Sequence, residues 1–145
     1  TVDILTPGTK EALKPVFIAA LNTAAQPLPF LDYIMEATER AAVVNGEGIL
    51  VNLPNPARFA FHKLIISRER AAAMQAKVQK DMAQSAALFS ILAEDRPGDI
   101  LLAYEAIIAR GPSWTGKLKK AMPVFAAKYP EEYKKLLSAA PKLKV

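Results

Sequence analysis

Residues 53–70, LPNPARFAFHKLIISRER, place His62 and Lys63 side by side in a mostly apolar segment. Burying a lysine ammonium costs free energy unless an anion pairs with it. Lys63 therefore either extends its head to solvent along an apolar stem or points into a cleft that binds phosphate. The segment alone leaves both options open.

Further polar residues follow on one side of a predicted helix. At 100° per residue, Lys77, Asp81 and Gln84 fall within about 40° of Arg70. This line fits the wall of a cleft, and it also fits a solvated face on which Lys77 and Asp81 form an i,i+4 pair worth about 0.2–0.5 kcal/mol. Taken alone, the pattern favours the solvated face. An apolar stripe expected to face the core runs beside the line: Ala71, Val78, Met82, Phe89 and Leu92.

Two isolated residues could bind metal. His62 is the only histidine and the chain has no cysteine, so a zinc site would need carboxylates as its other ligands. A hydrogen-bonded core histidine is the more common role. Asp3 lies in TVDIL among aliphatic and β-branched residues. At a strand end its carboxylate faces solvent harmlessly, and its hard oxygens also suit Mg²⁺ as one ligand.

Strands are expected in the first part of the chain to position these residues. The alternation in Val2–Leu5 predicts a short strand that stops in a turn at Pro7-Gly8. VFIAAL, residues 16–21, fits a strand or a helix. Residues 29–41 have helical spacing, and AAVVNGEGILVNL predicts a hairpin that turns at Asn45-Gly46.

Helices are expected from residue 55 onward. Asn55 is a good cap for a helix that starts at Pro56 and runs to about Ser67. The later helices are predicted over about Ala71–Glu94, over RPGDILLAYEAIIARG, after a cap at Ser113 with an interruption at Pro123, and from Pro130. The fold class is therefore α+β, with a strand and hairpin part over 1–54 and a helical part over 55–145.

Composition limits the classes of protein that fit. At 145 residues, with 52% hydrophobic and 23% charged residues, the chain is expected to be a single globular domain or a piece of one. No run of 18 apolar residues occurs, so no membrane association is predicted. The absence of cysteine rules out disulfides and thiolate metal sites, and it fits a reducing compartment such as the cytoplasm.

The charge is positive and unevenly distributed. A net charge of +5 and a pI near 9.5 suggest a polyanionic partner, such as nucleic acid or a nucleoside phosphate. Residues 116–145 contain eight lysines against two glutamates. Such a basic tail is more often a solvated surface than a nucleic-acid reader, and no aromatic interleaving accompanies it here.

Three stretches together resemble bacterial proteins of the nucleotidyltransferase fold: the strand around Asp3, NPARFAFHKLIISRER and KVQKDMAQSAALFSIL. The similarity is to a group known as nucleotidyltransferases that is related to abortive-infection and toxin–antitoxin transferases. It covers about residues 1–95. Its most specific part is P-x-P-x-R-[FY]-A-x-H-K-L followed by K-D-x-x-Q.

This resemblance implies a phosphoryl-transfer site with two metals, in which carboxylates hold Mg²⁺ ions that bridge a nucleoside triphosphate and activate an acceptor hydroxyl. By resemblance Asp3 is a metal ligand and Asp81 a catalytic residue. Without a triphosphate, Lys63 is expected to reach solvent or to pair with Asp81. The nucleotide-binding residues that the resemblance implies are Lys63, Arg70, Lys77, His62 and Arg58.

The sequence departs from the family pattern. The Gly-Ser element and the Asp-x-Asp/Glu pair are absent from these 145 residues, and Gln84 stands where relatives usually carry a second acid. We therefore expect the C-terminal part of a nucleotidyltransferase, inactive by itself. The whole enzyme would move a nucleotidyl group from a nucleoside triphosphate to an unidentified RNA, protein or small-molecule acceptor.

Two alternatives remain from other functional classes. One is a non-catalytic binding module, either a degenerate transferase or an antitoxin-like partner of protein or nucleic acid. The other is a basic helical nucleic-acid-binding domain, whose binding would fall steeply with salt. A homodimer through an unpaired strand edge near Thr1 is also expected.

Overall fold

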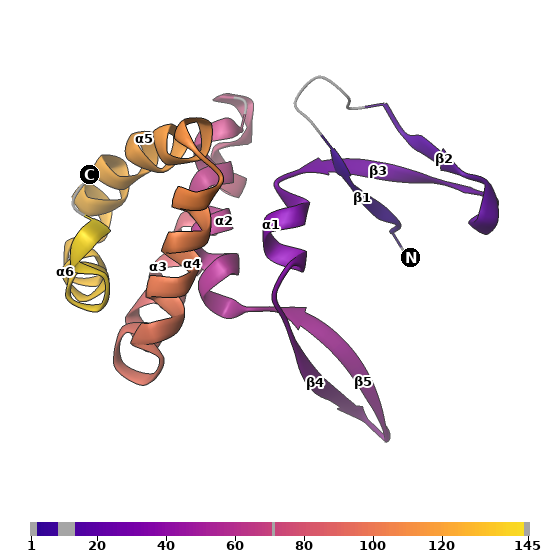
Figure 1. The fold of residues 1–145 in the computed structure, drawn as a ribbon, viewed down its shortest axis with the longest axis horizontal. Helices are drawn as coiled ribbons and strands as arrows, with labels where there is room; N and C mark the ends of the chain where they lie inside the picture. The colour runs from indigo at the N-terminus through magenta and orange to yellow at the C-terminus, as the bar shows by residue number, and fades with distance from the viewer. Residues whose placement is uncertain (1–2, 9–13, 71, 144–145) are drawn as a thin grey trace. The chain divides into compact units, whose positions relative to one another are not determined.

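The structure is a computed structural model, and it describes residues 3–8, 14–70 and 72–143. It confirms the α+β class, because the described strands all precede residue 55 and the long helices follow it (Figure 1). The chain divides into two compact units, Thr1–Pro54 and Asn55–Val145. None of the described helices is long and apolar enough to cross a membrane.

The first unit contains a three-stranded sheet and a separate hairpin. β3 is the central strand of the sheet, with β1 parallel to it on one side and β2 antiparallel on the other. β1 is therefore an edge strand in the described part of the chain. The homodimer expected through an edge near Thr1 stays a prediction, because Thr1 lies outside the described residues. The elements are β1 (Leu5–Gly8), β2 (Val16–Ile18), β3 (Thr23–Pro29), α1 (Leu31–Met35), β4 (Thr38–Asn45) and β5 (Glu47–Pro54).

The first strand begins later than predicted. Val2 is outside the described residues, Asp3 precedes the strand, and β1 includes the Pro7-Gly8 pair that was expected to form a turn. An edge strand tolerates a proline, because the missing N–H need not donate to a neighbour. A Cβ on Gly8 would lie 2.5 Å from Cβ of Pro27, so this close approach of β1 to β3 requires glycine.

The ambiguous segment VFIAAL forms two kinds of structure. Val16–Ile18 pairs with β3, and Ala19–Leu21 then forms a single 3-10 turn. Asn22 follows in the left-handed region, with φ 45°. This residue turns the chain back into β3, and asparagine is one of the few non-glycine residues that adopt this conformation readily.

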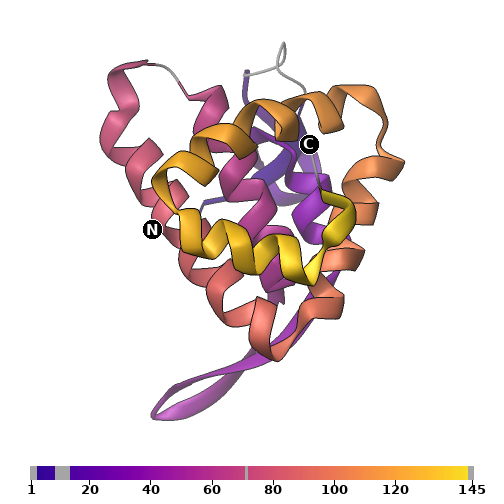
Figure 2. The ribbon, with the colours of Figure 1, turned by 90° about the vertical axis from the view of Figure 1, so that its left-hand side faces the viewer.

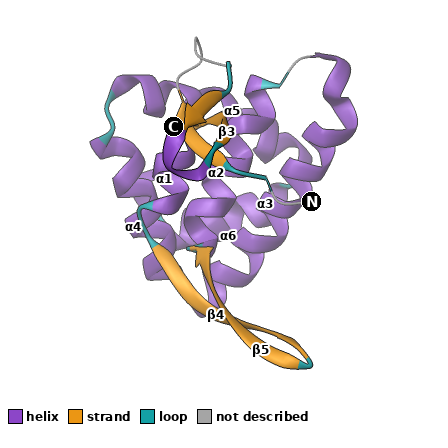
Figure 3. Cartoon of the chain, turned by 90° about the vertical axis from the view of Figure 1, so that its right-hand side faces the viewer, coloured by secondary structure: helices purple, strands orange, loops and turns teal. Residues whose placement is uncertain are grey.

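The hairpin is confirmed and is longer than predicted. Gly46 has φ 81° and turns the chain between β4 and β5, which pair from Asn45↔Glu47 to Thr38↔Pro54 (Figure 3). The helix expected over residues 29–41 is consequently too long, because its last four residues belong to β4. Ladder hydrogen bonds to β5 override the local helical spacing there.

The second unit is helical. Four of its five long helices start with proline at the first helical position, where the missing N–H has no intrahelical partner to lose. Within this unit α5 packs against α2 and α6 against α3, so that α5 and α6 lie in front of α2 in the view of Figure 2. The helices are α2 (Pro56–Glu69), α3 (Gln75–Asp95), α4 (Pro97–Ala109), α5 (Pro112–Lys128) and α6 (Pro130–Ala139).

The predicted cap at Asn55 is confirmed, and two details of α5 are corrected. The side-chain oxygen of Asn55 accepts hydrogen bonds from the backbone N–H groups of Ala57 and Arg58, at 3.0 and 3.2 Å. Gly111, with φ 87°, stands at the cap of α5 instead of Ser113. The helix continues through Pro123, which is exposed, so the carbonyl that loses its partner can bond water.

Aromatic rings join three helices in the core of the second unit. The ring centroids of Phe61 and Phe89 are 4.9 Å apart, and those of Phe89 and Phe125 are 5.8 Å apart. Both pairs are edge-to-face, the arrangement that aromatic quadrupoles favour. The apolar stripe predicted on α3 is confirmed at its buried members Met82, Phe89 and Leu92. Val78 is half-buried, and Ala71 lies outside the described residues.

Candidate functional site

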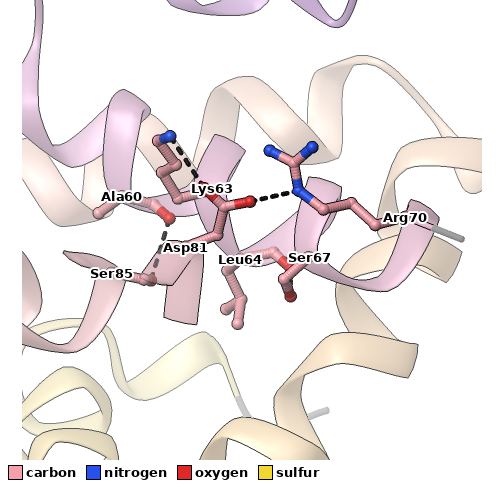
Figure 4. Close-up of polar contacts among 7 residues, drawn as sticks. All are labelled: Ala60, Lys63, Leu64, Ser67, Arg70, Asp81 and Ser85. Atoms are coloured by element: carbon pink, nitrogen blue, oxygen red, sulfur yellow. Dashed lines mark hydrogen bonds and ion pairs between the residues drawn. The ribbon is translucent and has the colours of Figure 1, made fainter. Parts of the chain in front are cut away.

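A buried carboxylate between α2 and α3 binds two cations. Asp81 of α3 is 3% exposed, and its Oδ1 accepts a hydrogen bond from Nζ of Lys63 at 2.9 Å. Its Oδ2 accepts one from Nε of Arg70 at 2.6 Å (Figure 4). We call Lys63, Arg70 and Asp81 the cationic cluster. With two positive charges and one negative charge, the cluster carries a net charge of +1.

Packing of α2 against α3 positions the cluster. One turn along from the Lys63–Asp81 contact, Oγ of Ser85 donates a hydrogen bond to the carbonyl of Ala60 at 3.0 Å. The residue numbers of these two contacts fall on α2 as they rise on α3, so the helices run antiparallel here. The buried hydroxyl thus fixes the register in which Asp81 meets Lys63.

Arg70 reaches the cluster from the end of α2. The helix stops at Glu69, and Arg70 has an extended backbone with φ −74° and ψ 145°. The expectation that Arg70 belongs to the same helix as Asp81 is therefore wrong. A 3-10 turn at Ala72–Met74 precedes α3, so the chain leaves helical geometry between the two residues. Their contact comes from the chain reversal.

The polar line predicted along α3 is not one surface. Lys77 is exposed, Asp81 is buried and Gln84 is half-buried, with its Oε1 buried and lacking a hydrogen-bond partner in the described structure. The alternative in which Asp81 pairs with Lys77 is also corrected. Within the described residues the ion-pair partners of Asp81 are Lys63 and Arg70.

The pKa of Asp81 reflects a competition. Burial disfavours the ionised carboxylate and acts to raise its pKa, but hydrogen bonds from Arg70 and Lys63, together with their positive charges, outweigh burial. The net effect holds the pKa of Asp81 below its usual value. The carboxylate is therefore ionised at neutral pH and remains the anion that both cations need.

The structure shows how the ammonium of Lys63 is accommodated in a mostly apolar segment. The Lys63 side chain is 18% exposed, and its ammonium donates a hydrogen bond to Asp81. The ammonium also lies 5.0 Å from the ring centroid of Phe59. The structure thus contains the Lys63–Asp81 pair, one of the two arrangements expected for this lysine. The ring of Phe59 adds a cation–π contact, a partner that the sequence analysis missed.

Comparison with known proteins identifies the family to which the chain belongs. The model of a family described as Nucleotidyltransferase matches residues 1–109, well over half of the chain. The chain belongs to this nucleotidyltransferase family. The match includes the whole cationic cluster and ends with α4, before α5 and α6 begin. No curated protein and no solved structure matches the chain.

The other residues implied by the nucleotidyltransferase resemblance lie outside the cluster. Arg58 precedes Lys63 by five residues, which places it about 140° around α2. His62 is half-buried and adjoins Lys63 in sequence, about 100° around the helix. Asp3 lies in the first unit and is exposed. Their predicted roles in nucleotide or metal binding stay predictions.

The described residues do not by themselves fit the two-metal site that the resemblance implies. Such a site needs several carboxylates within reach of one another. Among the described residues, no three His, Cys, Asp or Glu side chains are grouped so that they could hold a metal ion. Both oxygens of Asp81 already accept hydrogen bonds from cations. We therefore derive no chemical step through a metal.

The sequence analysis did not identify Ser85, although the sequence carries a signal for it. Ser85 stands four residues after Asp81, on the same side of α3, and its small hydroxyl suits a close helix contact. By contrast, the ion pair between Lys117 of α5 and Glu69, at 3.2 Å, joins residues 48 positions apart. Periodicity within one helix could not have identified that pair.

Proposed function

We propose that this nucleotidyltransferase uses a nucleoside triphosphate as its donor and that Lys63 and Arg70 contact the triphosphate. In the transfer, a hydroxyl oxygen of the acceptor bonds to the α-phosphorus and the bond to the pyrophosphate oxygen breaks. Pyrophosphate leaves with that electron pair, and the hydroxyl proton passes to solvent. The observation that carries the proposal is the pair of cations held on one buried carboxylate.

The two cations retain capacity for an anion. Lys63 uses its ammonium as a point charge with three donors, and one donor is bonded to Asp81. Arg70 bonds Asp81 through Nε, and its two terminal nitrogens are directed away from that bond in Figure 4. The side chains are 18% and 25% exposed, so a ligand can reach them. Phosphate oxygens match both donor types.

We assign Asp81 a positioning role within this proposal. A carboxylate whose pKa is held below its usual value is a weak base, so it is poorly suited to accept a proton from an acceptor hydroxyl. Its two bonds instead hold Lys63 and Arg70 a fixed distance apart. The catalytic role that the resemblance implies for Asp81 would require direct contact with substrate.

Other parts of the proposal rest on the resemblance. These are the contacts of Lys77, His62 and Arg58 with nucleotide, and Mg²⁺ bound with Asp3 as one ligand. In a complete site Mg²⁺ would supply charge neutralisation at the phosphates. The cytoplasmic location and the relation to toxin–antitoxin transferases also remain proposals.

The first experiment measures nucleotide binding. Titration calorimetry with ATP, GTP, CTP and UTP, in magnesium-containing buffer, should detect at least one of them. Lys63→Gln and Arg70→Gln should each weaken that binding about 10-fold or more, because each removes a charged hydrogen bond worth about 1.5–3 kcal/mol. Lys80→Gln is the matched control, because it removes one exposed lysine from the same unit.

The outcomes bear differently on the candidate functions. Equal binding by the parent and by both cluster variants, with melting temperatures near that of the parent, would remove Lys63 and Arg70 from the nucleotide site. Binding without transfer of a labelled nucleotide is what both candidate functions predict for this chain by itself, because the Gly-Ser and Asp-x-Asp/Glu elements are absent from its 145 residues. That outcome therefore leaves the enzyme and the non-catalytic binding module undistinguished. Transfer of label that depends on the cluster would support the enzyme.

A further inference from the structure

We propose that the outer face of α5 binds the phosphate backbone of nucleic acid. The charge of the chain changes sign where the nucleotidyltransferase match ends. Residues 1–109 contain ten Lys and Arg against twelve Asp and Glu, a net charge of −2. Residues 110–145 contain nine against two, a net charge of +7. The positive charge of the chain therefore belongs to the part beyond the family match.

α5 concentrates this charge on solvent-facing positions. The helix contains four lysines and no acidic residue. Leu118, Met122 and Phe125 are buried, whereas Lys119 and Lys120 are exposed. Lys128, at the last turn, is also exposed. Lys119 and Lys128 are nine residues apart, or about 13 Å along the axis and about 180° around it, so they flank Lys120 on the two sides of the exposed face.

The exposed lysines of α5 differ from the lysines around them in their partners. Lys117 pairs with Glu69, Lys134 with Glu131 and Lys135 with Glu94. In the part of the chain that the structure describes, no carboxylate forms an ion pair with Lys119, Lys120 or Lys128. The ammonium of Lys128 lies 5.6 Å from the ring centroid of Tyr129. This cation–π contact does not neutralise the positive charge of the lysine. These three side chains are therefore available to phosphates.

The chemistry of the face favours nucleic acid over a membrane surface. A helix that lies on a bilayer needs large apolar side chains beside its basic residues. The exposed large hydrophobic residues of the described structure end at Ile108, so α5 has none. Its exposed positions are instead small or basic: Pro112, Ser113, Lys119, Lys120, Pro123, Ala127 and Lys128. Phosphate contacts made by lysines need no apolar component.

The experiment uses the whole chain and needs no nucleotidyl transfer, so its result is independent of the proposed function. Fluorescence anisotropy would follow binding of a labelled single-stranded RNA of about 12 nucleotides, and of DNA of the same sequence, from 50 to 200 mM NaCl. The variant Lys119→Gln/Lys120→Gln/Lys128→Gln should bind at least 10-fold more weakly. Its plot of log K against log salt should be shallower by about 2, since three phosphate contacts are lost at about 0.7 each.

The matched control is Lys14→Gln/Lys80→Gln/Lys142→Gln, which removes three exposed lysines outside α5 and has the same net charge. It should bind within about threefold of the parent. Equal losses in both triple variants would overturn the proposal, because total charge and not the α5 face would then decide binding. Absence of binding at 50 mM NaCl, or preferential binding to phosphatidylserine vesicles over the oligonucleotides, would overturn it as well. Circular dichroism melting confirms that each variant is folded.

Discussion

The cationic cluster and the outer face of α5 use the same kind of side chain in opposite surroundings. Lys63 and Arg70 are bound to a buried carboxylate that fixes their positions. Lys119 and Lys120 project into solvent, with no ion-pair partner among the described residues. Fixed cations suit one phosphate group at one place, whereas solvated cations suit a repeating backbone and are screened by salt. The placement of charge, more than its amount, distinguishes the two regions.

Removing the anion of the cluster should have the largest effect on stability. Asp81→Asn leaves two partly buried cations without a charged partner, and we expect the free energy of unfolding to fall by about 2 kcal/mol, from urea denaturation at pH 7. The α5 triple glutamine variant should change it by less than about 0.5 kcal/mol, since those lysines are exposed. Similar losses in both proteins would erase the distinction between the regions.

The cluster is coupled to pH through Asp81. Its pKa is lower in the folded protein than in the unfolded chain, because Arg70 and Lys63 outweigh burial. Ionisation therefore stabilises the fold fully above the unfolded pKa, near 4, and this contribution is lost as pH falls through the lower folded pKa. We expect the stability difference between the parent and Asp81→Asn to be constant from pH 8 to about 5.

Below that range the difference should shrink towards zero, measured by urea denaturation at a series of pH values. The α5 triple variant provides the reference, because glutamine for lysine introduces no group that titrates in acid. If the stability difference between the parent and Asp81→Asn persists unchanged at pH 2, the shape of asparagine, and not the loss of the charge, causes the destabilisation. The ion pairs would then not be the source of the stability.

The sequence predicts features of this site that depend on neighbouring residues. The cap at Asn55, with Pro56 after it, is local chemistry and is confirmed. The part of the α3 stripe formed by Met82, Phe89 and Leu92 follows from helical spacing and is also confirmed. The pairing of Lys63 with Asp81 was one stated option, because a buried lysine needs an anion. Whether this pair forms depends on the antiparallel packing of α2 on α3, and the spacing of residues in the sequence does not determine that packing.

The errors arise where tertiary structure decides. Arg70 meets Asp81 because the chain reverses between them, and no helical projection could show this. Pro123 stays inside α5 because Met122 and Phe125 are packed in the core and hold the helix on both sides of it. Thr38 belongs to β4 because β5 pairs with it. In each case a local preference is outweighed by contacts with residues distant in sequence or by the core.

The smallest effect that we predict concerns the ion pair linking the two regions. Lys117 belongs to α5 and Glu69 to the last turn of α2, next to Arg70, and their charged atoms are 3.2 Å apart. The side chains are 18% and 22% exposed, so water screens the pair and its coupling should be about 0.5 kcal/mol. A double-mutant cycle with Lys117→Gln and Glu69→Gln, followed by urea denaturation, measures this energy.

The same cycle tests whether the two regions act independently. If they do, neither substitution changes nucleotide binding by more than about twofold, although Glu69 adjoins Arg70 in sequence. A coupling energy well above 1 kcal/mol, together with weaker nucleotide binding by Lys117→Gln, would instead join the cationic cluster and α5 into one electrostatic unit. The fixed and the solvated cations would then not be separable by mutation.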